Sequence, residues 1–118
     1  MQEINLSRES FKKFSDFLVS FAPRFAAHLD PINRPNFNYG FGVANVHFRA
    51  SFSRHETGAG YTLIFSESSM NPISACLSCS ISETGELLKV VGSDITAERA
   101  ELIFSTFRHI VLSHRFLL

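Results

Sequence analysis

The sequence predicts a two-layer α+β domain, in which an N-terminal helix and a C-terminal helix cover one face of a four-stranded antiparallel meander (α-β-β-β-β-α). The first observation is that residues 73–82, ISACLSCSIS, alternate between apolar residues and a second set of Ser and Cys. Successive side chains of a strand point to opposite faces, so this stretch is typical of a half-buried central strand. The second observation is that apolar side chains near each end of the chain recur at helical spacing, which indicates two amphipathic helices.

Length and composition indicate one domain with one core. The chain has 118 residues, enough for a single hydrophobic core, and residues 1–118 are treated as one domain. Thirteen Phe and no Trp supply much apolar ring surface for that core. Eleven basic and eleven acidic side chains cancel, which disfavours a general nucleic-acid binder because such proteins usually carry a basic excess.

The first helix is expected to begin after Ser7, a good N-cap residue, and to end by Leu29, before the Asp30-Pro31 pair. Pro23 should kink or restart it, because proline lacks the N–H that an inner turn of a helix needs. The apolar stripe of this helix is interpreted as core packing, with a coiled-coil seam as the alternative. The stripe consists of Phe11, Phe14, Phe17, Leu18, Phe21 and Phe25.

Residues 30–42, DPINRPNFNYGFG, form a long connection rich in Pro, Gly, Asn and aromatic residues. Two interpretations are open. In the first, the segment is an irregular edge strand that packs its rings under the first helix, since large apolar rings favour burial. In the second, it is a binding loop that exposes Arg34, Phe37 and Tyr39.

Four strands are expected after this connection. The first begins at Ala44 and points His47 and Arg49 outward. The apolar parity switches just before it, which predicts a bulge or a bend near Gly42. The expected strands are residues 44–53, 61–66, 73–82 and 87–91, separated by turns at residues 55–60, 68–72 and 83–86.

The last helix is expected to begin near Asp94 or Thr96, either of which can cap it. Its apolar stripe should face the sheet. The stripe consists of Ala100, Ile103, Phe104, Phe107, Ile110, Val111 and His114.

The C-terminal end carries apolar residues that lie partly off this stripe, namely Leu112 and Phe116, and the sequence finishes Phe116-Leu117-Leu118. Little chain remains there to cover these side chains. We therefore expect a partner or a second copy of the chain to cover them.

No residue pattern indicates catalysis. Cys76 and Cys79 form a C-x-x-C within a strand, whereas redox pairs place the first Cys at a helix N-terminus. His47 and Cys76 share a face, but an intervening strand puts them roughly 10 Å apart, too far to hold one zinc ion. Neither a G-x-S-x-G motif nor a glycine-rich phosphate loop is present. We therefore expect no enzyme activity and no catalytic, cofactor-binding or metal-binding residues.

The chain is expected to be a soluble, cytoplasmic protein. Its N-terminal residues lack the apolar run of a signal peptide, and no stretch approaches the ~18 apolar residues of a membrane span. Cys76 and Cys79 point to opposite faces of their strand, so they should remain unpaired, as in a reducing compartment.

By elimination, the sequence favours a non-enzymatic module that binds a protein partner, most simply a small stoichiometric inhibitor of the anti-defence or immunity type. The uncovered face of the sheet and the long connection are the surfaces favoured for binding. The predicted partner-binding residues are Arg34, Phe37, Tyr39, His47, Arg49, Leu112, Phe116, Leu117 and Leu118.

Other functions stay open. A nucleic-acid partner, less favoured by the charge balance, would be contacted by arginines and stacking rings. These residues are Arg24, Arg34, Arg49 and Arg54 with Phe37 and Tyr39. A secretion-type chaperone, or a small enzyme with an apolar pocket between helices and sheet, is the other alternative. Homo-oligomers are also compatible with the sequence, and a membrane partner is not expected.

Overall fold

The computed structural model describes residues 2–68 and 76–114. It confirms an α+β fold with an antiparallel sheet and a helix toward each end of the chain, but the sheet has six strands instead of the expected four. The additional strands, β1 and β2, precede those that the alternation predicts. The elements are β1 (Gln2–Glu3), α1 (Arg8–Ala26), β2 (Asn36–Val43), β3 (Val46–Arg54), β4 (Tyr61–Glu67), β5 (Cys76–Ile81), β6 (Leu87–Ser93) and α2 (Ala97–His114).

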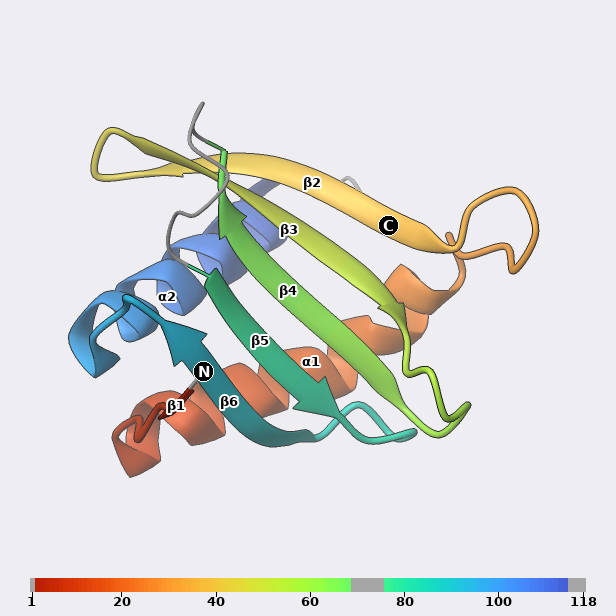
Figure 1. Cartoon of the computed structure of the whole chain (residues 1–118), viewed down its shortest axis with the longest axis horizontal. Coiled ribbons are helices and arrows are strands. Elements are labelled where there is room, and N and C mark those ends of the chain that lie inside the picture. Colours follow the sequence, from red (N-terminus) through yellow and green to blue (C-terminus); the bar gives the residue numbers. More distant parts are fainter. Residues whose placement is uncertain (1, 69–75, 115–118) are drawn as a thin grey trace.

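The molecule has two layers. Figure 1 shows both helices behind the sheet, and no helix of the described residues covers the face turned to the viewer. Strands β2 to β6 form an antiparallel meander, and β1 pairs with β6, so the order across the sheet is β1-β6-β5-β4-β3-β2. The edge strands are therefore β1 and β2.

Strand β2 replaces most of the connection expected at residues 30–42. Its eight residues pair with β3 without interruption, from Asn36↔Ser53 to Val43↔Val46. Residues 36–43 thus form an edge strand, as the first interpretation has it, and not a loop that fully exposes Phe37 and Tyr39. The physical reason is the alternation itself, since Phe41 and Val43 are buried on the helix face while their neighbours are exposed. Binding of a partner by this segment stays a prediction.

A tight turn joins β2 to β3, which corrects two expectations. Ala44 and Asn45 both have positive φ, 49° and 67°, as a two-residue hairpin of type I′ requires. The first predicted strand therefore begins at Val46 instead of Ala44. The parity switch near Gly42 is produced by this turn and not by a bulge.

The core lies between the helices and the sheet. Phe14 of α1 stacks on Phe104 of α2 with ring centroids 4.3 Å apart and planes at 13°, and Phe65 of β4 tilts against Phe104 at 5.5 Å. The stripe of α1 thus packs inside its own chain, which confirms core packing over a coiled-coil seam. Pro23 lies within α1, which continues to Ala26 without restarting.

Both helix caps form as the sequence predicts. The hydroxyl of Ser7 accepts a hydrogen bond from the Ser10 N–H at 3.1 Å, and that of Thr96 accepts one from the Arg99 N–H at 3.2 Å. Thr96, not Asp94, therefore caps α2. Neither helix of the described chain has the length and apolar character that a membrane-spanning helix requires.

Candidate functional site

The candidate site is the open face of the sheet, the face opposite α1 and α2 (Figure 1). Strand register sets its residues in rows that cross the sheet. One row runs through Ser51, Ile64, Ser78 and Val91. The open face contains Asn36, Asn38, Gly40 and Gly42 of β2, His47, Arg49, Ser51 and Ser53 of β3, Thr62, Ile64 and Ser66 of β4, Cys76, Ser78 and Ser80 of β5, and Lys89, Val91 and Ser93 of β6.

Short side chains make most of this face flat. Ile64 is 37% exposed at its centre, and its cross-strand neighbours are Ser51 and Ser78. Hydroxyl-bearing strands can stay solvated, and they also let another surface approach the sheet closely. The face can therefore offer one central apolar contact within a wide polar surround.

Two basic side chains lie near the start of β3. Arg49 is exposed and lies opposite Gly40, and His47 lies opposite Gly42. The imidazole of His47 leans over Gly40, since a β-carbon at that glycine would lie 3.1 Å from His47 Nε2. Because Gly40 and Gly42 have no side chains, nothing on β2 covers the side chains of Arg49 and His47 opposite them.

The predicted site residues do not form one surface. His47 and Arg49 lie on the open face, whereas Phe37 and Tyr39 are half-buried on the helix face. Phe37 stacks on His28, with ring centroids 4.9 Å apart, and on Phe25 at 6.1 Å. The sheet therefore separates the predicted rings from the predicted basic side chains.

The other predicted residues lie elsewhere. Arg34 is exposed in the turn before β2, where its backbone exchanges hydrogen bonds with Asp30 at 2.8 and 2.9 Å. Leu112 is 46% exposed on α2, on the helical layer. Phe116, Leu117 and Leu118 lie outside the described residues.

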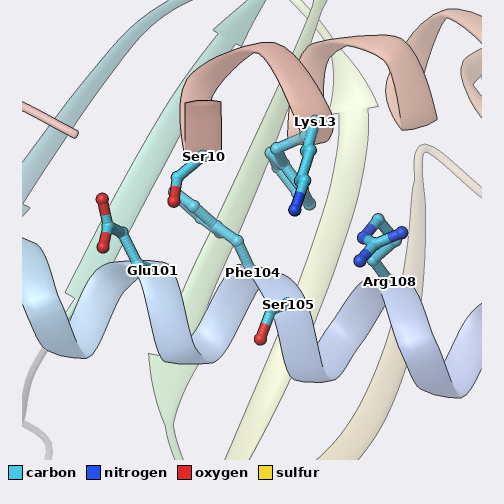
Figure 2. Close-up of a pocket in the computed structure, with 7 residues that line it drawn as sticks. Ser10, Lys13, Glu101, Phe104, Ser105 and Arg108 are labelled. Atoms are coloured by element: carbon cyan, nitrogen blue, oxygen red, sulfur yellow. The ribbon is translucent and has the colours of Figure 1, made fainter. Parts of the chain in front are cut away.

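A second feature, which the sequence did not reveal, is a hollow of about 120 Å³ between the helices (Figure 2). Lys13 and Arg108 stand toward one end and Glu101 at the other, with Phe104 between them. Seven residues line it: Ser10, Lys13, Phe14, Glu101, Phe104, Ser105 and Arg108. This volume is below the ~300 Å³ at which small-molecule pockets begin.

The carboxylate of this hollow already has a structural role. Glu101 Oε1 accepts a hydrogen bond from the Ser7 backbone N–H at 2.8 Å. This bond, with further ones from the hydroxyls of Ser7 and Ser10, holds the pKa of Glu101 below its ordinary value. A carboxylate that stays ionised and engaged is poorly suited to act as a general acid or base.

The thiols are likewise unactivated. Cys79 is fully buried and Cys76 is half-buried, and burial raises the pKa of both thiols. Within residues 2–68 and 76–114, no group of three or more His, Cys, Asp and Glu side chains is placed to hold a metal ion.

Comparison of the chain with protein-family models, with curated proteins and with solved structures finds no match.

Proposed function

We propose that the chain is a non-enzymatic module that docks a protein partner on the open face of its sheet, most simply as a stoichiometric inhibitor. The observation that supports this proposal is the one-sided cover of the sheet. Both helices pack on the same face (Figure 1). The strand register gives the other face many Ser, Thr, Asn and Gly residues, with Ile64 at its centre.

The chemistry of this face suits a protein surface. Interfaces usually combine a small apolar centre with a polar rim, and Arg is over-represented among the residues that carry the binding energy. Ile64 supplies the centre, and Arg49 and His47 supply polar contacts toward the β2 edge. Few long side chains must be ordered on this face, so docking costs little side-chain entropy.

A nucleic-acid partner is less well supported. Arg54 packs over the ring of Tyr61 at 5.5 Å, and Arg24 packs over Phe21 at 5.0 Å. These arginines belong to the helix face and the helical layer, whereas Arg49 lies on the open face. The arginines and rings proposed for stacking therefore do not share one surface.

An apolar ligand pocket is also weakly supported. The space enclosed by Phe25, Tyr39 and Phe107 between the helices and the sheet measures about 10 Å³. A cavity needs about 10–15 Å³ by this measure to hold one water molecule, so this space does not admit a small molecule without repacking.

The experiment compares one substitution at two positions. The wild-type chain captures its partner from the native host, and the captured partner is then titrated against Ser78→Arg on the open face and Ser105→Arg on α2. Ser78→Arg is expected to bind roughly 30-fold more weakly, the factor for a loss of about 2 kcal/mol. Ser105→Arg should bind like the wild type. Loss of binding only in Ser105→Arg would move the site to the interhelical hollow.

Salt separates the two classes of partner. Contacts to phosphates release counterions, so added salt weakens them steeply. We expect a shallow dependence for the captured partner, and a steep one would favour nucleic acid.

A further inference from the structure

Strand β2 is an edge strand, and the register tells which of its backbone groups face outward. The His47 carbonyl accepts a hydrogen bond from the Ser68 N–H at 2.7 Å, so His47 directs its backbone groups toward β4. Residues of a strand alternate between its two neighbours. The backbone N–H and C=O groups of every second residue of β3 therefore point toward β4, namely those of Arg49, Ser51 and Ser53. The β2 residues opposite these positions point their own backbone groups away from β3, toward the edge of the sheet. The outward-directed residues are Asn36, Asn38, Gly40 and Gly42.

Within residues 2–68 and 76–114, this edge carries none of the usual protection against another strand. Natural proteins shield edges with charged side chains, prolines or bulges. β2 (Asn36–Val43) contains no charged residue and no Pro, and it pairs with β3 without a register shift. The four outward-directed residues are all exposed. At the other side of the sheet, β1 covers part of β6.

We propose that two copies of the chain associate through antiparallel pairing of β2 with β2, about a two-fold axis at Tyr39. In this register, Asn36 lies opposite Gly42 of the second copy, and Asn38 lies opposite Gly40 of the second copy. Every residue with outward-directed backbone groups then has a hydrogen-bonding partner. A register shifted by two residues leaves Asn36 or Gly42 of each copy unpaired.

The side chains favour a second copy as the occupant. Each hydrogen-bonded pair sets a glycine against an asparagine, so no two bulky side chains meet on the open face. On the helix face, Phe37 lies opposite Phe41 of the second copy, and Tyr39 lies opposite its own counterpart. Aromatic cross-strand pairs stabilise antiparallel strands, and an uncharged strand does not repel its copy. Phe37 and Tyr39 are only half-buried in one chain, so pairing covers ring surface that is otherwise exposed.

The association goes beyond the proposed function and does not depend on it. Directly paired residues share a face, so the open faces of both copies lie on the same side. Two sheets of six strands join into one continuous sheet.

A proline substitution tests the edge. Asn38→Pro removes one outward-directed N–H and spares the β2–β3 ladder, since proline is tolerated where the N–H of an edge strand faces solvent. Asn38→Ala keeps the N–H and is the matched control. In sedimentation, the wild type and Asn38→Ala should have twice the 13.3 kDa mass of one chain, and Asn38→Pro should have the mass of one chain with an unchanged far-UV circular dichroism spectrum. A single-chain mass for the wild type, or a folded Asn38→Pro that stays dimeric, would overturn the proposal.

Disulfide trapping tests the register, and it decides the matter if Asn38→Pro does not fold. In a Cys76→Ser background, Tyr39→Cys places two thiols at a non-hydrogen-bonded pair, where Cα atoms are about 4.5 Å apart and a disulfide fits. Mild oxidation should then give a covalent dimer. Asn36→Cys in the same background should not cross-link, because its counterpart lies about 20 Å away along the strand. Equal cross-linking of both variants, or of neither, contradicts the pairing.

Discussion

Glu101 of α2 accepts a hydrogen bond from the backbone N–H of Ser7, 94 positions earlier in the chain, at a distance of 2.8 Å. Ser7 is also the N-cap of α1, so one residue links the capping of the first helix to the first turns of the second. Glu101 also stands at one end of the interhelical hollow (Figure 2). Its hydrogen bond with Ser7 adds a polar link between two helices that the stacking of Phe14 on Phe104 holds together.

The first prediction concerns the pH dependence of this contact. Folding lowers the pKa of Glu101 from its ordinary value of 4.5. A carboxylate of this kind contributes stability above its unfolded-state pKa, and the contribution is lost as the pH falls through the lower folded-state pKa. Glu101→Gln should therefore lower the free energy of unfolding near neutral pH by only about 0.5 kcal/mol, because water screens this solvent-exposed carboxylate. The difference from the wild type should vanish in acid.

Urea unfolding across the acidic range measures this difference. Glu98→Gln is the matched control, since Glu98 is exposed in the first turn of the same helix. A Glu101→Gln deficit that persists in strong acid would show that the charge of Glu101 is not its cause.

The second prediction concerns the two thiols. Cys79 has no exposed surface, whereas Cys76 lies half-buried on the open face. A thiol reagent should modify Cys76 rapidly in the native state and Cys79 only on unfolding. Cys79→Ser should destabilise the fold by about 1–3 kcal/mol because it buries a hydroxyl, and Cys76→Ser should be nearly neutral. Rapid native labelling of both thiols would contradict the register of β5.

The third prediction compares two glycines of the β3–β4 loop. Gly58 and Gly60 both have positive φ, 85° and 82°. A β-carbon at Gly60 would collide with the backbone carbonyl of Ile81, whereas Gly58 faces open space. Gly58→Ala should therefore cost only the backbone strain, about 1 kcal/mol, and Gly60→Ala should cost roughly 3 kcal/mol because steric overlap adds to it. Thermal unfolding of both variants checks this prediction. Equal losses of stability would contradict the close approach of Gly60 to the Ile81 carbonyl.

The fourth prediction compares two arginines on opposite faces of β3. Arg49 is exposed on the open face, and Arg54 packs over Tyr61 on the other. Arg49→Ala should weaken partner binding by about 1–3 kcal/mol at an almost unchanged Tm. Arg54→Ala should leave binding unchanged. Titration calorimetry with the captured partner measures both, and the reverse order of effects would place the partner on the helix face.

Periodicity predicted the parts of the fold that carry a strong hydrophobic pattern. The alternation around Cys76 and Cys79 correctly divides the two faces of β5, and the spacing of Phe14 and Leu18 correctly gives the buried side of α1. These predictions succeed because one face of a regular helix or strand is buried, so apolar residues recur along the sequence with the period of that element.

The edge strand β2 was predicted only as one of two interpretations of residues 30–42. Gly40 and Gly42 weaken the strand signal of β2, and the turn at Ala44 uses a φ of 49° that Ala seldom adopts. The hydrogen bonds to β3 stabilise β2 as a strand although the intrinsic strand preference of its residues is weak. The turn also places Tyr39 and Arg49 on opposite faces, as the edge-strand interpretation implies, so these two predicted site residues do not share a surface.

The link between the helices also had no local signal. Ser7 and Glu101 are each ordinary residues of a helix start, and only the packing of α1 on α2 brings them together. The interhelical hollow was therefore missed, whereas His47 and Arg49 were correctly placed on the outward face by alternation.

The most direct test of the open face as the binding surface is photo-cross-linking in the native host. A photoreactive phenylalanine analogue replaces Ser78 on the open face in one variant and Ser105 on α2 in another, and both variants must melt like the wild type. We predict that Ser78 gives one dominant adduct with a single protein and that Ser105 gives none above background. An adduct from Ser105 alone, with none from Ser78, would contradict the account.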